Sequence, residues 1–245
     1  MRRMLAGMAL AVFAVVLIHR AVAAQGGNSP VGDWELTVIG SDRGYESVTF
    51  SNDFSMTGYG ITRDSFGLYT LMGNWNLDGK GDVVAGFVRF LNGNGVAGEF
   101  TAKISNNSKL NAKAKTSTGH IRLKGESATD FPDISGNWVG EVKKIGSTHF
   151  ESYSLTAVTN LPSVFNLTGQ GVGAGGPYSV SGAIIVNSSN RAQGFTIADP
   201  NGSGSRTNSV AGKFDRQARK ARLHGIDDNH NGVHIDLNRG VIPRD

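Results

Sequence analysis

The residues best suited to chemistry lie in one acidic loop near the C-terminus. Asp227, Asn229 and Asn231 alternate along the chain, and Gly232 follows them. Oxygen ligands at alternate positions before a glycine are typical of the first half of a calcium-binding loop. Position twelve of such a loop is a bidentate glutamate, whereas this chain has Asn238 there. The loop therefore predicts either a calcium site formed by its Asp and two Asn residues, or a polar hairpin turn, which is the simpler interpretation.

Basic residues form a second candidate site, and they occur in both halves of the chain. The stretch from Thr101 to Gly125 holds no acidic residue, and the stretch from Lys213 to Arg222 is interrupted only by Asp215. On a β-surface such residues form either a patch for polyanions or a solvated face whose lysines protect an edge strand. The predicted polyanion-binding residues are Lys103, Lys109, Lys113, Lys115, Arg216, Arg219, Lys220 and Arg222.

The partners that fit this basic patch are anionic glycans, lipid head groups or a protein. Nucleic acid fits less well, because aromatic side chains are not interleaved with the basic residues and bases would have nothing to stack on. Sequence alone leaves the ligand unknown.

No pair of residues predicts a catalytic site. Glu46 and Glu151 are the only carboxylates that we align between the two halves, and we interpret both as polar residues on a solvated strand face. One carboxylate per half does not supply the two that a glycosidase needs. Residues 171–176 match G-x-G-x-x-G, but a strand follows where a dinucleotide site needs a helix. The absence of cysteine excludes disulfides and thiolate sites. We predict a protein that is not an enzyme and has no cofactor, the calcium hypothesis apart.

Two copies of one β-rich unit carry these residues. Residues 54–73 read FSMTGYGITRDSFGLYTLMG, and residues 165–182 read FNLTGQGVGAGGPYSVSG. Each reads as strand, glycine-rich turn and strand, so the chain holds a duplicated hairpin. Apolar and polar residues alternate with a period of two, which predicts antiparallel strands with one solvated face. Residues 216–223 are the one helix-prone stretch, and we predict a strand there because its counterpart, 109–115, alternates clearly.

The predicted fold is all-β, with two tandem homologous antiparallel β-barrels, or barrel-like sandwiches, of about eight short strands each. The units begin at Gly32-Asp33-Trp34 and Gly136-Asn137-Trp138. This G-x-W opening before short antiparallel strands resembles the avidin and lipocalin barrels of the calycin type. The resemblance implies a tryptophan that closes one end of each barrel. It implies no biotin site and no lipid pocket, because no ligand-contacting motif of either family is present.

The N-terminus predicts export. Arg2 and Arg3 precede the uncharged run of residues 5–18, which is short for a membrane span, and small-x-small cleavage sites end at Ala23 and Ala24. Cleavage removes three arginines and no acid, so the net charge falls from +4 to +1. The predicted organisation is a signal peptide 1–24, a polar lead 25–31, a first barrel 32–124, a linker 125–135, a second barrel 136–239 and a tail 240–245.

The sequence favours an exported, bacterial-type binding or structural module, periplasmic or extracellular, without a transmembrane helix in the mature chain. Two alternatives stay open at this point. One is a calcium-dependent exported enzyme or binding protein that uses the loop of residues 227–238. The other is an outer-membrane β-barrel with all strands in one ring, because lipid-facing and lumen-facing residues also alternate.

Overall fold

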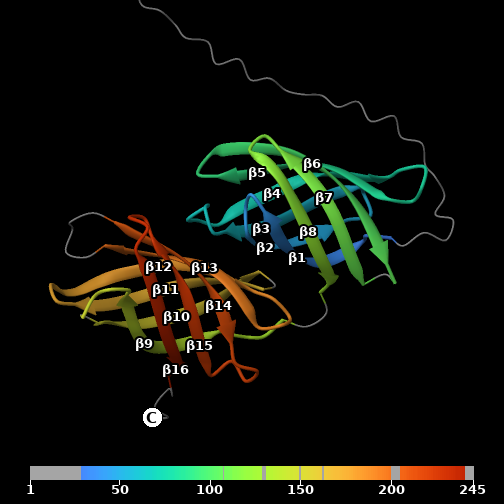
Figure 1. The fold of residues 1–245 in the computed structure, drawn as a ribbon. Helices are drawn as coiled ribbons and strands as arrows, with labels where there is room; N and C mark the ends of the chain where they lie inside the picture. The colour runs from blue at the N-terminus through green and yellow to red at the C-terminus, as the bar shows by residue number, and fades with distance from the viewer. Residues whose placement is uncertain are drawn as a thin grey trace, which may run out of the picture.

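A computed structural model describes residues 29–106, 108–128, 131–148, 150–161, 163–199 and 205–240. These residues form two closed antiparallel barrels of eight strands each, in tandem along the chain (Figure 1). The predicted all-β class and the tandem barrels are confirmed. The strands close in two separate rings and not in the single ring of the outer-membrane alternative. The predicted signal peptide lies outside the described residues.

Barrel 1 is a meander in which each strand pairs with the next, and the last strand pairs with the first. Its strands are β1 (Gly32–Gly40), β2 (Gly44–Phe50), β3 (Ser55–Thr62), β4 (Tyr69–Leu77), β5 (Val83–Leu91), β6 (Asn94–Ser105), β7 (Lys109–Thr116) and β8 (Gly119–Ser127).

Barrel 2 repeats this topology, and β16 closes the ring against β9. Its strands are β9 (Gly136–Lys144), β10 (Phe150–Leu161), β11 (Val164–Gly173), β12 (Gly176–Val186), β13 (Arg191–Asp199), β14 (Arg206–Phe214), β15 (Lys220–Asp227) and β16 (Gly232–Arg239). Within the described ranges no helix has the length and apolar character of a membrane span.

Side chains fill the interior of both barrels. In barrel 1 the ring of Phe50 meets Trp75 and Phe100 edge-on, with centroids 6.2 and 6.3 Å away. In barrel 2 the ring of Trp138 meets Phe214 edge-on at 5.2 Å. The void beside these rings in barrel 2 measures about 20 Å³, which is room for a water molecule and not for an organic ligand. The interiors are therefore packed cores.

A buried tryptophan occupies the same place in each barrel. The indole nitrogens of Trp34 and Trp138 donate to the carbonyl oxygens of Pro30 and Ile134, four residues earlier in each case, at 2.6 and 2.8 Å. Arg239 lies over the Trp138 ring, with its Cζ 6.0 Å from the centroid. The burial agrees with the place that the calycin resemblance implied for the tryptophan, whereas the relationship to avidin or lipocalin stays a prediction.

The stretch of residues 216–223 corrects one prediction. β15 begins only at Lys220, and a hairpin turn precedes it. Asp215 forms this turn, because its carboxylate accepts the amide of Arg219 at 2.7 Å and its carbonyl accepts the amide of Ala218 at 3.0 Å. A short polar side chain that bonds to the backbone ahead of it favours a turn over a strand. The predicted strand is thus right from Lys220 onward and wrong for the residues before it.

The two barrels contact each other through a small apolar interface. Ile61 of β3 is fully buried and packs with Val164 and Ile185 of barrel 2. The half-buried rings of Tyr59 and Phe195 pack against this cluster. The interface is separate from both barrel cores, so each barrel has a core of its own.

Candidate functional site

A groove of about 790 Å³ runs between the barrels. On one side it is bounded by β1, β7 and β8 of barrel 1, and on the other by β14 and the turn between β12 and β13 of barrel 2. This turn is fixed in place, because the amide of Phe214 donates to the carbonyl of Asn190 at 2.8 Å. The groove is therefore built by elements that are far apart in the sequence.

Glu35 links the barrels at the groove. Its two carboxylate oxygens accept the backbone amide of Ser188 at 2.7 and 2.9 Å, and one of them also accepts the Ser188 hydroxyl at 2.8 Å. Burial raises the pKa of Glu35, and the hydrogen bonds from Ser188 offset part of that rise. The carboxylate of Glu35 is therefore held at the contact between the barrels by a neutral partner.

Cations face each other across the groove. Lys109 and Lys124 come from barrel 1, and Arg191 and Lys213 come from barrel 2. All four side chains are exposed, and none of them takes part in an ion pair among the described residues. Burial raises the pKa of Tyr45 at the groove, and the neighbouring Arg191 acts in the opposite direction. The groove thus brings four cations from the two barrels together with two carboxylates, Glu35 and Glu126, which leaves an excess of positive charge.

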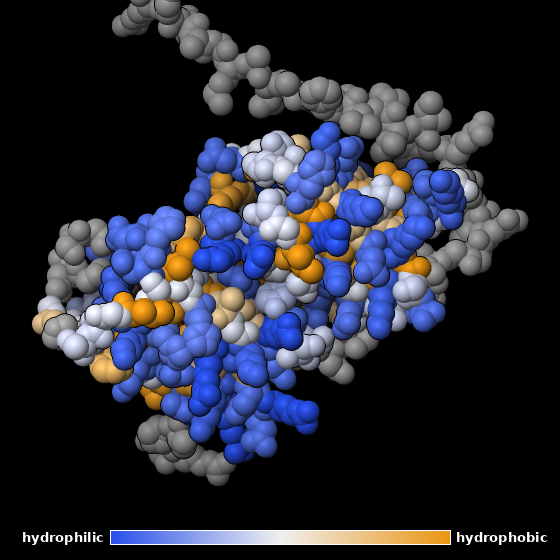
Figure 2. Space-filling model, in the orientation of Figure 1, coloured by the Kyte–Doolittle hydropathy of each residue, from blue (hydrophilic) through white to orange (hydrophobic). Residues whose placement is uncertain are grey.

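The basic surface continues from the groove over the outer face of β6, β7 and β8, where Figure 2 shows hydrophilic side chains. Lys113 stands directly opposite Arg122, and Lys103 stands opposite Asn111, which in turn stands opposite Lys124. Adjacent strands lie about 4.8 Å apart, so like charges opposite each other repel and destabilise the sheet. The sheet keeps this unfavourable arrangement, which a merely solvated face does not require.

Barrel 2 carries a matching row. Arg191 stands opposite Lys213, which stands opposite Arg222, so three cations follow one another across β13, β14 and β15. The row ends at Asp236, which stands opposite Arg222. The Asp236 carboxylate lies 3.7 Å from Arg222 Nε and 3.0 Å from His234 Nε2. Two barrels thus present cations at their surfaces on either side of one groove.

The predicted polyanion-binding residues fall in three places. Lys109 lines the groove. Lys103, Lys113 and Lys115 are exposed on the outer faces of β6 and β7. Lys220 and Arg222 are exposed on β15, and Arg216 and Arg219 lie in the turn before it. Sequence reasoning missed Arg191, because it stands alone after the turn of residues 187–190, outside both basic stretches. Only the pairing of β13 with β14 places it beside Lys213. Their role in binding stays a prediction.

The predicted calcium loop is a hairpin turn between β15 and β16. The carboxylate of Asp227 is fully buried, lies 2.9 Å from the ammonium of Lys144 and accepts the amides of Asn229 and Asn231 at 3.0 and 2.8 Å. Burial alone would raise the pKa of Asp227, but the hydrogen bonds from Lys144 and Asn231 lower it to about 2. No group of three or more His, Cys, Asp or Glu side chains is arranged for a metal in the described residues. The calcium hypothesis stays an untested prediction.

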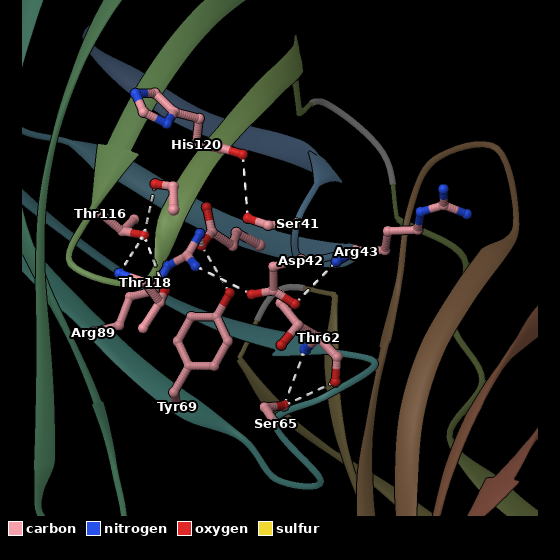
Figure 3. A network of polar contacts seen from close by, with 12 residues as sticks. Ser41, Asp42, Arg43, Thr62, Ser65, Tyr69, Arg89, Thr116, Thr118 and His120 are labelled. Atoms are coloured by element: carbon pink, nitrogen blue, oxygen red, sulfur yellow. Dashed lines mark hydrogen bonds and ion pairs between the residues drawn. The ribbon is translucent and has the colours of Figure 1, made fainter. Parts of the chain in front are cut away.

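A buried cluster of Tyr, Glu and Arg lies in barrel 1, and Figure 3 shows its Tyr69 and Arg89 beside Asp42. The Tyr69 hydroxyl donates to Glu46 Oε1 at 2.8 Å, and Arg89 Nη2 lies 2.7 Å from the same oxygen. Arg89 Nη1 reaches Asp42 at 3.3 Å, and its Cζ lies 5.2 Å from the centroid of the Tyr69 ring. Burial raises the pKa of Tyr69 well above its ordinary value, and Glu46 adds to the rise.

The same three residue types meet in barrel 2. Arg206 binds Glu151 through two parallel hydrogen bonds of 2.9 and 2.5 Å, and the Tyr178 hydroxyl donates to the same carboxylate. Burial acts to raise the pKa of Glu151, but these hydrogen bonds outweigh it, so the pKa is lowered. Burial also raises the pKa of Tyr178.

Only the tyrosines of these clusters are equivalent. A side chain at Gly60 would collide with the Tyr69 ring, and one at Gly171 with the Tyr178 ring, so each glycine makes room for its tyrosine. Gly60 pairs with Glu46, whereas Gly171 pairs with Tyr153. The position of Glu46 is therefore held by a tyrosine in barrel 2, and Glu151 stands two residues away. The arginines also differ, because Arg89 is in β5 and Arg206 is in β14, the counterpart of β6.

The interpretation of Glu46 and Glu151 as surface residues in register is therefore wrong. Glu46 is 1% exposed and faces inward together with Val48 and Phe50 of the same strand. The signal was in the sequence, because these residues alternate with Tyr45, Ser47 and Thr49, and the odd-numbered face is the more polar one. Each cluster joins several strands from inside, with its carboxylate neutralised by an arginine.

Comparison with known proteins assigns the chain to no family. No protein-family model matches the chain, and no curated protein matches it. A redesigned β-barrel, mFAP1 bound to DFHBI, is 12% identical with a TM-score of 0.39 over 43% of this chain and 94% of that one. A candidate outer membrane protein from Bacteroides fragilis is 10% identical with a TM-score of 0.31, over 86% and 97% of the two chains. The vaccine antigen transferrin-binding protein B from Haemophilus parasuis is 12% identical with a TM-score of 0.27, over 87% and 75%. At these TM-scores we base no argument on these similarities.

Proposed function

We propose that this chain is an exported, non-catalytic binding protein that holds an anionic polymer on the outside of its two barrels. One observation carries the proposal: basic residues of both barrels line one groove and continue on the outer faces. They form the pair Lys113–Arg122 in barrel 1 and the row of Arg191, Lys213 and Arg222 in barrel 2. The interiors offer no comparable space, because aromatic and aliphatic side chains fill them. A ligand therefore binds at the surface.

The chemistry of the surface defines the class of ligand. Lysine and arginine attract sulfate, phosphate and carboxylate groups, and a row of cations favours a chain that repeats such groups. Like charges that repel each other in the free protein become favourable neighbours when an anion lies between them. We name the outer face of β6, β7 and β8 the basic face, with Lys103, Lys113, Lys115, Arg122 and Lys124 as its cations.

Charge reversal tests this proposal. The variant Lys113→Glu with Arg122→Glu places two acids at the centre of the basic face, and we expect it to weaken heparin binding at least tenfold, which is about 1.4 kcal/mol. The matched control is Arg63→Glu with Lys80→Glu, which reverses two exposed cations next to β3, β4 and β5. We expect the control to retain most of the affinity in a fluorescence titration at low salt. Equal losses in both variants would contradict a localised surface.

A further inference from the structure

We infer that the groove is a clamp in which one segment of the anionic chain is held by both barrels at once. This inference rests on the proposed function and adds the place where the ligand makes its main contacts with the protein. Lys124 reaches the groove from barrel 1, and Arg191 and Lys213 reach it from barrel 2. A single sulfate or phosphate between these walls is bound from both sides.

Two acids, Glu35 and Glu126, offset only part of this charge. Glu35 accepts three hydrogen bonds from Ser188, which hold its carboxylate at the contact between the barrels. Glu126 stands opposite Lys109 in the pairing of β7 with β8, so these two charges offset each other. Lys124 stands opposite the neutral Asn111, whose amide also lines the groove and adds a hydrogen-bond donor. The excess positive charge therefore lies at the three cations that face each other across the groove.

The shape of the groove favours a flexible chain over a membrane surface. A groove between two convex barrels admits a narrow polymer, whereas the flat surface of a lipid bilayer cannot follow it inward. Membrane-binding surfaces also present apolar side chains that insert below the head groups. Of the large apolar side chains that are exposed on the described surface, Ile39 alone lines the groove. The geometry points to an anionic polysaccharide or a polyphosphate chain.

The clamp predicts that cations on the two walls act together. A short ligand fits in the groove and touches little else, so it depends on the groove cations. A long polymer also covers the basic face and depends on both sets. Removing the cations of one wall leaves the bound group with contacts to the other wall alone. The effects of removing the two walls are then non-additive.

The experiment uses the mature chain, residues 25–245, and isothermal titration calorimetry at low salt. The groove variant is Lys124→Gln with Lys213→Gln, which removes one charge from each wall. The matched control is Lys80→Gln with Lys143→Gln, which removes one exposed charge from each barrel outside both the groove and the basic face. The probes are a heparin-derived tetrasaccharide and inorganic tripolyphosphate, which distinguish a sulfated glycan from a phosphate chain.

For at least one of the two probes we expect the groove variant to bind about tenfold more weakly and the control less than threefold more weakly. We also expect the two single groove variants to show a coupling in a double-mutant cycle. Equal weakening by both double variants overturns the clamp and leaves the proposed function standing. If the unmodified protein binds neither long heparin nor long-chain polyphosphate, the proposed function itself is overturned. Binding to phosphatidylglycerol vesicles that the groove variant does not reduce also overturns the clamp.

Discussion

At the scale of single residues, the most consequential feature is a buried carboxylate that forms an ion pair with one arginine. Glu46 is 1% exposed, and the guanidinium of Arg89 is its cationic partner, at 2.7 Å. Removing one member of such a pair leaves an uncompensated charge in a low-dielectric environment, which costs several kcal/mol. Replacing both members with apolar or neutral residues of similar volume costs far less.

The first stability prediction follows from this asymmetry. Arg89→Met should lower the free energy of unfolding by about 3 to 5 kcal/mol, because Glu46 stays buried without its partner. The double variant Glu46→Gln with Arg89→Met should recover at least half of that loss. Urea unfolding followed by tryptophan fluorescence measures both. An Arg89→Met protein within 1 kcal/mol of the unmodified protein would show that the pair does not stabilise barrel 1.

At the scale of elements, the turn between β15 and β16 makes stability depend on pH. The folded pKa of Asp227 is about 2, below its ordinary value of 3.8. A lowered pKa means that the ionised carboxylate stabilises the fold above about pH 4, and that this contribution is lost as the pH falls toward 2. Asp227→Asn should therefore reduce the loss of unfolding free energy between pH 4 and pH 2 by roughly 2 kcal/mol.

Chemical denaturation at several pH values measures this difference, with Asp236→Asn as the control on the exposed face of β16. The same pH dependence in Asp227→Asn and in the unmodified protein would contradict the role of the carboxylate in the turn. The Asp227→Asn protein also tests the calcium hypothesis. A calcium-induced rise in Tm that this variant abolishes would support a metal site in place of a purely structural turn.

The elements were largely predictable from sequence because the sequence repeats. Gly60 and Gly171 recur with Tyr69 and Tyr178 because each glycine makes room for a ring, and the duplicated hairpin followed from that pattern. The Glu–Arg clusters were not predictable from the repeat, because Glu46 and Glu151 occupy non-equivalent positions. Aligning the two halves by residue type makes Glu46 and Glu151 equivalent. The strand pairing shows that they are not, because the barrel 2 counterpart of Glu46 is Tyr153.

The candidate site was predictable only in part, for a related reason. The basic stretches are local in the sequence, so Lys109 and Lys113 were found. The groove depends on how the two barrels pack, through Ile61 and the Glu35–Ser188 contact, and no local pattern encodes that packing. Arg191 joins the site only through that packing and the pairing of β13 with β14.

At the scale of the whole molecule, the barrels are two units with separate cores and a shared interface. Barrel 1 extends to Ala128, because β8 ends at Ser127 and the amide of Ala128 donates to the Asp33 carbonyl at 2.8 Å. Barrel 2 has begun by Ile134, which is buried in its core. A cut between residues 129 and 132 therefore leaves both cores intact. We expect each half to fold alone and the two halves to associate weakly when mixed, because Ile61 and Ile185 would otherwise be exposed.

Sedimentation and thermal unfolding of the separate and mixed halves measure this expectation. Ile61→Asp should abolish the association and leave each half folded, because the residue lies in the interface and not in either core cluster. If neither half folds alone, the division into two independent barrels is contradicted. If the halves fold but never associate, the interface is too weak to form the groove, and the clamp loses its basis.

The most direct test of the central claim is the affinity of the mature chain for heparin, measured at increasing salt, with neutral dextran as the control. A polymer held by several lysines and arginines releases or displaces counterions, so its affinity falls steeply as salt rises. We predict tight binding at low salt, a loss of at least tenfold on raising the salt from 50 to 200 mM by analogy with nucleic-acid binding, and no binding of dextran. Absence of binding to both heparin and long-chain polyphosphate at low salt, or binding that salt does not weaken, would contradict the account.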